Sequence, residues 1–238
     1  MSRYYKYNGL ELPSVTTITG QLDKPALMPW AANCAIDYLI EDIDNNVDHR
    51  FDIGLEWVTL SSVHITAESA RKNYRTVSRK ALDIGSRVHG AIEDYLNIGK
   101  EPYNPSDEVL SAFLAFLEWF DENNVQPIQA EKTVYGEKYA GTCDLVCLLD
   151  GEKYLIDFKS SKGIYPEMRY QVAGYRQTDE SIKGCGILRL DKITGLPEWK
   201  DTSSTYEDDR RVFNILVDLW WATHPRKRAQ FEKIKEAA

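Results

Sequence analysis

The sequence predicts an α/β protein with a mostly helical first half and a second half that contains strands. Apolar residues recur at helical spacing through most of residues 16–124, and short β-type runs separated by turns begin near residue 126. The chain has 238 residues, of which 43% are hydrophobic, enough for one sizeable core. We therefore expect one domain over residues 1–238, with a helical part (1–125) and a sheet-containing part with a C-terminal helix (126–238).

Three helices are expected in the first half. Residues 25–41 carry spaced apolar positions and open near Pro29, whereas residues 41–54 are acidic and predict a loop. Residues 78–97 and 109–123 repeat the helical spacing, and the turn-rich stretch EPYNPSDE separates them.

The second half alternates strands and helices. Strands are expected at residues 131–135, 140–149 and 153–159, and a hairpin at 184–190 and 198–201. Pro166 opens a helix that reaches about residue 177, because proline suits the first helical turn. A long helix is expected at residues 205–223, with Pro225 just beyond it and a basic, amphipathic tail after that.

The pair Asp150-Gly151 predicts a tight hairpin turn, because it lies between alternating apolar residues. If Leu149 pairs with Glu152, counting outward puts Asp144 opposite Asp157 and Thr142 opposite Lys159. Side chains alternate along a strand, so these four polar residues share one face.

Two carboxylates directly opposed across strands repel each other unless a proton or a cation lies between them. Carboxylate oxygens suit Mg²⁺ or Mn²⁺. The alternative is a solvated sheet edge, at which Lys159 neutralises one aspartate and the other is exposed. The hairpin alone leaves these two interpretations about even.

Other polar residues have ordinary explanations when each is taken alone. Gln171 and Tyr175 are four residues apart and share one helix face, where Tyr175 could be a core residue and Gln171 a surface residue. Glu131 could be one surface glutamate among many, and a lone histidine in a helix, such as His89, is more often structural than a ligand.

The order of these residues resembles a known family. Gly85-x-x-x-His89, Gly141-Thr-Cys-Asp144, Asp157-Phe-Lys159 and Gln171-x-x-x-Tyr175 follow one another as in the RecB-type branch of the PD-(D/E)XK nuclease superfamily. The opening LPSVTTITGQLDKPALMPWA is similar to phage and mitochondrial genome-maintenance exonucleases of that branch. The likeness therefore spans most of the chain.

The resemblance implies a PD-(D/E)XK core, in which helices flank a small mixed sheet, and an Mg²⁺- or Mn²⁺-dependent deoxyribonuclease activity. It implies that the metal is bound by His89, Asp144, Asp157 and the carbonyl of Phe158. It also implies a catalytic role for Lys159, supported by Gln171 and Tyr175, with Glu131 at an acidic position seen in some members.

The cysteines argue against an iron–sulfur cluster. Branches of the family with a cluster use one cysteine before the core and three near the end, whereas no cysteine follows Cys185 here. No C-x-x-C pair is present, so structural zinc and a disulfide framework are also disfavoured. We expect reduced, packed thiols.

DNA binding would depend on local positive charge, because the net charge of the chain is −8. Basic residues recur every four positions before His89, although an ordinary solvated helix face would look the same. The candidate DNA-binding residues are Arg71, Arg75, Arg79, Arg87, Lys162 and Arg169.

The preferred function is a phage-like DNA exonuclease that acts on single- or double-stranded ends in DNA processing, recombination or degradation. A recombinase or helicase is a possible partner. The alternatives are a structure-selective or nonspecific endonuclease of the same fold, or a catalytically silent DNA-binding or assembly module. The sequence shows no membrane-spanning run and no targeting segment, so we expect a cytoplasmic protein, in the host cytoplasm if phage-encoded.

Overall fold

A computed structural model describes residues 3–25, 27–51 and 60–236, and the side chains of these residues outside 43–65. Contacts divide the chain into two compact units. The first unit combines Met1–Leu22 with Gly85–Ala238, and the second is Asp23–Ile84.

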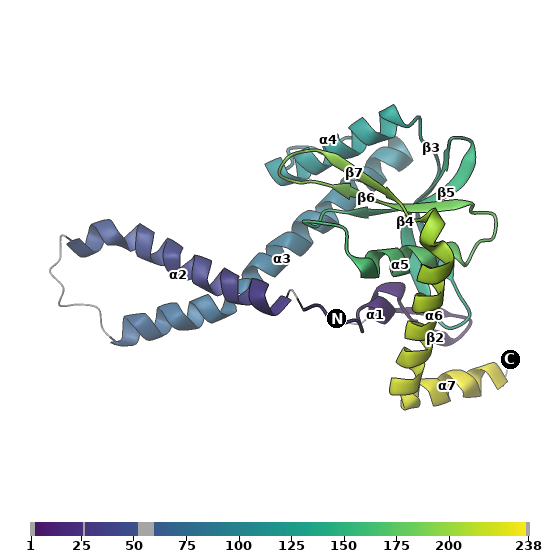
Figure 1. Cartoon of the computed structure of the whole chain (residues 1–238), viewed down its shortest axis with the longest axis horizontal. Helices are drawn as coiled ribbons and strands as arrows, with labels where there is room; N and C mark the ends of the chain where they lie inside the picture. The colour runs from purple at the N-terminus through teal and green to yellow at the C-terminus, as the bar shows by residue number, and fades with distance from the viewer. Residues whose placement is uncertain (1–2, 26, 52–59, 237–238) are drawn as a thin grey trace. The chain divides into compact units, whose positions relative to one another are not determined.

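The first unit is built on a five-stranded mixed sheet (Figure 1). Its strand order is β3-β4-β5-β6-β7; the β5–β6 pair is parallel and the other pairs are antiparallel. The expected α/β class with helices flanking a mixed sheet is confirmed. The strands are β3 (Gln126–Tyr135), β4 (Ala140–Leu149), β5 (Glu152–Lys159), β6 (Gly184–Leu190) and β7 (Pro197–Asp201).

The turn between β4 and β5 has the predicted form. Asp150 and Gly151 have φ values of 52° and 80°, as a two-residue turn with both residues left-handed requires. Leu149 pairs with Glu152, and the ladder continues to Leu145–Ile156, where it ends. The pairing that would have placed Asp144 directly opposite Asp157 lies one step beyond the end of this ladder.

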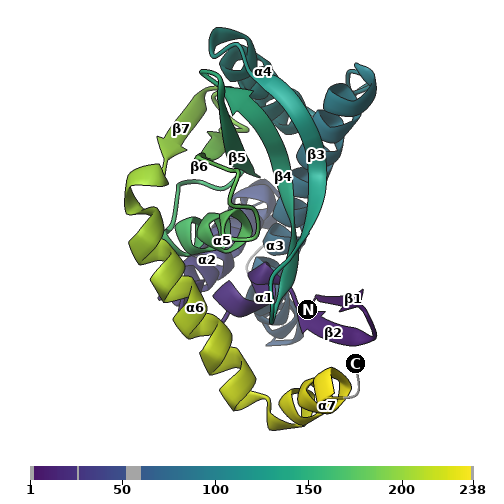
Figure 2. The ribbon, with the colours of Figure 1, turned by 90° about the vertical axis from the view of Figure 1, so that its right-hand side faces the viewer.

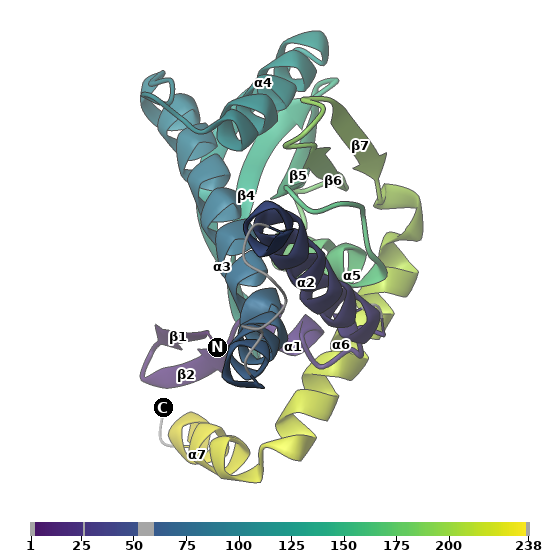
Figure 3. The same cartoon turned by 90° about the vertical axis from the view of Figure 1, so that its left-hand side faces the viewer.

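Helices cover both faces of this sheet (Figures 1 and 3). On one face, the ring of Phe116 in α4 lies 5.6 Å from that of Phe158 in β5. On the other face, Gln171 in α5 bonds to Asp157, the neighbour of Phe158 that points the opposite way. The helices of this region are α4 (Asp107–Glu122), α5 (Pro166–Arg176), α6 (Tyr206–Thr223) and α7 (Pro225–Glu236), with a 3-10 turn η1 (Ser203–Thr205) before α6.

A hairpin of β1 (Tyr4–Tyr7) and β2 (Leu10–Pro13), followed by α1 (Val15–Thr19), begins the first unit. It lies near the ends of β3 and β4 (Figure 2), and Ser14 forms a bridge with Ala140. Its turn residues Asn8 and Gly9 have φ values of 48° and 76°. The Asn-Gly pair is a strong hairpin signal, but no hairpin was predicted at this position.

The second unit contains α2 (Leu27–Phe51) and the first part of α3 (Leu60–Ile98). Buried Cys34 and Ala70 belong to it, and the Asn73 side chain donates to the Cys34 carbonyl at 2.8 Å. The loop predicted for residues 41–54 was wrong as far as Phe51, because no glycine or proline interrupts the helix after Pro29. The remainder of that loop, residues 52–54, lies outside the described residues.

Cys34, Cys143, Cys147 and Cys185 are all buried and unbonded to one another. Among the helices that the structure describes, none is both long and apolar enough to cross a membrane.

Candidate metal centre

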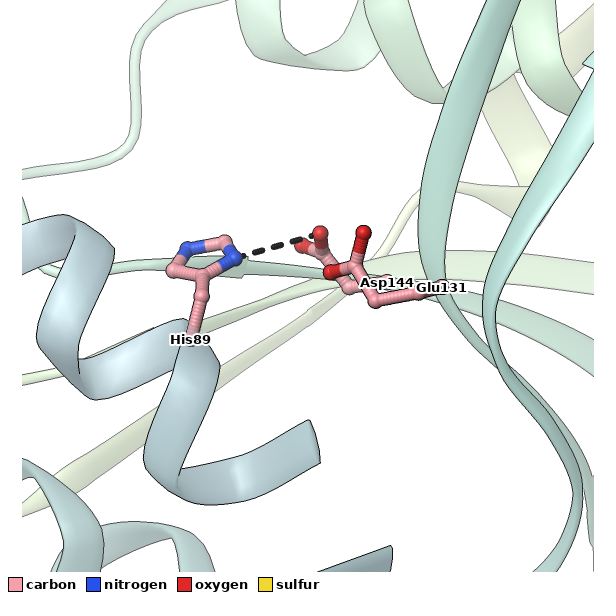
Figure 4. A group of neighbouring side chains, drawn as sticks. All are labelled: His89, Glu131 and Asp144. Atoms are coloured by element: carbon pink, nitrogen blue, oxygen red, sulfur yellow. Dashed lines mark ion pairs between the residues drawn. The ribbon is translucent and has the colours of Figure 1, made fainter. Parts of the chain in front are cut away.

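Three side chains from three elements meet at one edge of the sheet (Figure 4). They are His89 of α3, Glu131 of β3 and Asp144 of β4, and one ligand atom of each lies within 4.8 Å of the others. His89 Nδ1 is 3.2 Å from Asp144 Oδ1. Two carboxylates and an imidazole converging in this way are a donor set suited to a divalent cation.

The strand register brings Glu131 to this cluster. Ala130 pairs with Leu145 and Lys132 with Cys143, so Glu131 lies across from Asp144. Its φ of +46° is in the left-handed region, which costs a non-glycine residue roughly 1–2 kcal/mol. Strained backbone of this kind often re-aims a side chain at a functional site. Glu131 therefore belongs with the candidate ligands, not only with the catalytic residues.

Asp144 is the centre of the cluster. Its Oδ2 accepts the backbone N–H of Phe158 at 2.6 Å, and its side chain is 11% exposed. Burial raises the pKa of Asp144, but the charges of His89 and Lys159 and the Phe158 hydrogen bond outweigh it, so the pKa lies below its ordinary value. Burial disfavours the charged form of His89, but the negative charge of Asp144 outweighs burial and raises the pKa of His89.

Asp157 and Lys159 form a largely buried ion pair beside the cluster, with side chains 2% and 20% exposed. Desolvation raises the pKa of Asp157 to about 6, against the opposing attraction of Lys159. Burial acts to lower the pKa of Lys159, but Asp157 and Asp144 outweigh it and the pKa is raised. Lys159 is therefore an ammonium at neutral pH.

A second helix orients Asp157. Gln171 Nε2 donates to Asp157 Oδ1 at 3.2 Å and to the hydroxyl of Tyr175 at 2.9 Å. The ring of Tyr175 packs so closely on Gly141 that a Cβ there would lie 2.5 Å from its Cε1. The glycine two residues before Cys143 in β4 thus makes room for the tyrosine that holds the glutamine.

The geometry accommodates a small divalent ion. Ligands on opposite sides of Mg²⁺ stand about 4.2 Å apart, and no two of the three ligand atoms here are more than 4.8 Å apart. Asp157 Oδ2 is buried and faces the Lys159 ammonium in the ion pair. This oxygen could serve as a further ligand, although Asp157 lies outside the set of three.

The expected ligands therefore separate into two groups. His89 and Asp144 come together, and Glu131 joins them. Asp157 and Phe158 lie at the edge of the cluster, where the main-chain N–H of Phe158 orients Asp144. Coordination by Asp157 or by the Phe158 carbonyl stays a prediction.

The candidate DNA-binding residues lie in different surroundings. Arg71, Arg75 and Arg79 are exposed on α3 in the second unit, and Arg87 and Lys162 are exposed in the first. Arg169 instead forms an ion pair with buried Asp209 at 2.8 Å. Its guanidinium is already engaged inside the fold, which leaves it less able to bind a phosphate.

A contact between the N-terminal hairpin and strand β4 of the site was not predicted from the sequence. The hydroxyl of Tyr5 lies 2.9 Å from Thr142 Oγ1, two residues from Asp144. The three tyrosines before Asn8-Gly9 in the stretch RYYKYNG are a signal for a strand, because tyrosine favours strands and Asn-Gly favours a hairpin turn.

No protein-family model matches the sequence, and no curated protein matches it. Among solved structures, the chain is similar to the alkaline exonuclease LHK-Exo from Laribacter hongkongensis, with 12% identity, a TM-score of 0.34 and coverage of 68% of this chain and 87% of that one. It is also similar to SSO0001, with 15% identity, a TM-score of 0.27 and coverage of 56% and 72%. Both likenesses are too weak to carry a functional conclusion, so function is argued from the site.

Proposed function

We propose that this protein is a metal-dependent deoxyribonuclease that hydrolyses phosphodiester bonds. The observation that carries the proposal is the convergence of His89, Glu131 and Asp144 within 4.8 Å, beside the buried pair of Asp157 and Lys159. A purely structural site has no need to bring three carboxylates, a histidine and a lysine together at a sheet edge.

The donor set fits Mn²⁺ better than Mg²⁺, because Mg²⁺ prefers oxygen ligands and imidazole suits transition metals. When bound, a divalent ion there supplies positive charge to the phosphate and lowers the pKa of a coordinated water. Glu131 and Asp144 would bind the ion from β3 and β4, and His89 would bind it from α3.

Lys159 acts as a positioned cation. Its ammonium, held by Asp157, can orient the attacking water and offset the negative charge that develops on the phosphoryl oxygens. Because its pKa is raised, this role fits the geometry better than removal of a proton by a neutral lysine. Gln171 and Tyr175 are positioning residues, since Gln171 donates to Asp157 and Tyr175 holds Gln171.

The finer proposal is an exonuclease acting on DNA ends, as the family resemblance implies. An endonuclease of the same fold would use the same residues. The two differ in their action on covalently closed circles, which an exonuclease leaves intact. A silent DNA-binding module would not need the metal ligands, and its metal affinity would be negligible.

Variants of Lys159 separate catalysis from metal binding. We expect Lys159→Gln to bind Mn²⁺ in calorimetry but to lose at least about a hundredfold in DNA cleavage, since a positioned catalytic group contributes at least that much. Asp144→Asn should lose both. Lys100→Gln, an exposed lysine paired with Asp94, is the control.

Removing Lys159 leaves Asp157 buried without its cation, which can cost about 3–5 kcal/mol. Lys159→Arg keeps the charge and guards against loss of folding, and thermal unfolding of each variant shows which ones fold. Cleavage at the wild-type rate in folded Lys159→Gln would refute the proposed mechanism.

A further inference from the structure

The N-terminal hairpin presents a row of side chains that the proposed chemistry does not use. Arg3, Tyr5 and Tyr7 alternate and therefore lie on one face of the hairpin. The Arg3 guanidinium lies 5.1 Å from the centroid of the Tyr5 ring. Tyr7 stacks on Tyr135 of β3, with centroids 4.2 Å apart and planes 24° apart.

This row begins beside the cluster of His89, Glu131 and Asp144 and leads away from it. Tyr5 contacts Thr142, which pairs with Thr133, two residues along β3 from Glu131. Tyr135, at the far end, is four residues from Glu131, or about 13 Å along the strand at roughly 3.3 Å per residue.

Arg3 lies close to the cluster through its neighbour. Its guanidinium is beside the ring of Tyr5, whose hydroxyl contacts Thr142, two residues from Asp144.

The backbone holds Arg3 in place, and its guanidinium lies over the Tyr5 ring. Its N–H donates to Thr17 Oγ1 at 3.0 Å, and its carbonyl accepts from the Ser14 N–H at 2.9 Å. Among the described residues, its guanidinium forms no ion pair. By contrast, Lys227 and Lys235 nearby are paired with glutamates. A fixed arginine without a carboxylate partner can take a phosphate in two hydrogen bonds.

The far end of the row offers an aromatic surface. Tyr7 and Tyr135 are 43% and 40% exposed although they stack on each other. Tyr7 also lines a cavity of about 350 Å³, together with Leu10, Leu12 and Ile234.

We propose that this row is a track for one DNA strand, on which Arg3 binds a phosphate next to the scissile one and Tyr7, backed by Tyr135, stacks a base farther along. The track rests on the proposed function and adds the substrate's path. Stacking accepts any base, so the track favours a single strand without sequence preference. Its length matches about four nucleotides at duplex spacing, and fewer in a stretched strand.

Fluorescence anisotropy with labelled oligothymidylate in EDTA tests the track without cleavage. We expect Tyr7→Ala to weaken binding roughly tenfold and Tyr7→Phe to restore it. Arg3→Ala should weaken binding and reduce the salt slope by about 0.7, the value for one phosphate contact on a single strand. Matched controls are Lys6→Ala, an exposed cation at an alternate position of β1, and Tyr103→Ala, a tyrosine that is 95% exposed.

Abasic oligonucleotides locate the stacked base. One abasic position, moved stepwise through the first six nucleotides from either end, should weaken wild-type binding at one or two adjacent positions. With Tyr7→Ala, the affinity should not drop at any one abasic position of the same series.

Binding and cleavage report on different claims. If the wild type digests DNA and the Arg3 and Tyr7 variants bind like their controls, the track is wrong and the nuclease stands. If strand binding depends on Arg3 and Tyr7 but no metal-dependent cleavage occurs, the track stands and the nuclease is wrong. Absence of any strand binding by the wild type overturns the track whatever the cleavage result.

Discussion

Glu131 adopts a backbone conformation that glutamate seldom adopts. Its left-handed φ and its position across from Asp144 place two carboxylates together in a partly buried site. Both features cost folding free energy, because the backbone is strained and the like charges repel. Such a cost is expected where a cation is bound, and it gives a direct way to separate function from stability.

Glu131→Asn should stabilise the metal-free protein and weaken its metal binding. Asparagine tolerates the left-handed region and carries no charge, so we expect a gain of about 1 kcal/mol, or roughly 2–4 °C in melting temperature for a chain of this size. Mn²⁺ affinity should fall at least about tenfold.

Asp150→Asn is the matched control, since Asp150 is also an acidic residue with a left-handed φ but lies in the β4–β5 turn. It should leave Mn²⁺ binding unchanged. Equal loss of Mn²⁺ affinity in both variants would contradict the role of Glu131.

The titration of the site predicts how metal binding depends on pH. The pKa of His89 is raised, and that of Asp157 is raised to about 6. Protons on these groups compete with a cation, so affinity should rise with pH through this window. At pH values below the pKa of such a group, each proton that the metal displaces lowers the metal affinity about tenfold per pH unit.

Calorimetric titration with Mn²⁺ at pH 5.5 and pH 8.0 measures this dependence. We expect tighter binding at pH 8.0, and His89→Gln should reduce the difference. Equal affinity at the two pH values would show that neither proton is linked to metal binding.

The hairpin turn allowed Asp144 and Asp157 to be identified from the sequence as candidate site residues. It did not show that the β4–β5 ladder stops at Leu145–Ile156, which leaves the two carboxylates with different partners. The position of Glu131 beside Asp144 could not be predicted from sequence patterns. It depends on the β3–β4 register and on a left-handed φ that no local sequence signal indicates.

Among the elements, α5 positions the site through a close contact with β4. Gly141 leaves room for the Tyr175 ring, Tyr175 meets Gln171, and Gln171 holds Asp157. A larger side chain at Gly141 should therefore disturb Asp157 through Tyr175 and Gln171, although Gly141 and Asp157 are not in contact.

Gly141→Ala should destabilise the protein by about 1–3 kcal/mol, because a methyl group is forced into a packed interior. It should also lower DNA cleavage while leaving Mn²⁺ binding by the cluster of three largely intact. Gly90→Ala is the control, since Gly90 lies in α3 next to His89 and a Cβ there meets nothing within 4 Å.

Gly90→Ala should raise stability by up to about 1 kcal/mol, the helix preference of alanine over glycine. Melting temperatures and cleavage rates of the two variants test this pair of expectations. A wild-type cleavage rate in Gly141→Ala would show that Tyr175 does not position Asp157 through this contact.

The elements themselves were largely predictable where periodicity was strong. The helices at Pro166–Arg176 and Tyr206–Thr223 and the strands around Asp150 follow their sequence signals. The end of α2 was misplaced because acidic residues were taken for a loop, although they do not break helices as glycine and proline do. The hairpin at Asn8-Gly9 was missed because its strands have only four residues each.

For the whole molecule, a net charge of −8 means that any grip on DNA must come from local clusters. Many basic residues of the first unit are already paired with carboxylates, as Arg210 is with Glu207 and Arg228 with Glu232. In the second unit, the exposed residues Arg75 and Arg79 are the candidates for phosphate contacts.

Charge reversal tests these candidates. Arg75→Glu with Arg79→Glu should weaken DNA binding and reduce the salt slope by about 1.8 if each arginine contacts one phosphate of a duplex. Arg210→Glu with Arg228→Glu changes the net charge equally at two paired positions. A salt slope of the Arg75 and Arg79 double variant equal to that of this control would show that these two arginines do not contact DNA phosphates.

The central claim, metal-dependent hydrolysis of DNA at the cluster of His89, Glu131 and Asp144, is tested most directly by one digestion assay. Linear DNA labelled at each end in turn, and covalently closed circles, are incubated with the protein in Mn²⁺, Mg²⁺ or EDTA. We expect the end label to be lost only with a divalent ion, and faster with Mn²⁺. Closed circles should stay intact, and Asp144→Asn should show no activity. The absence of divalent-dependent cleavage of any substrate, or cleavage that survives Asp144→Asn, would contradict the claim.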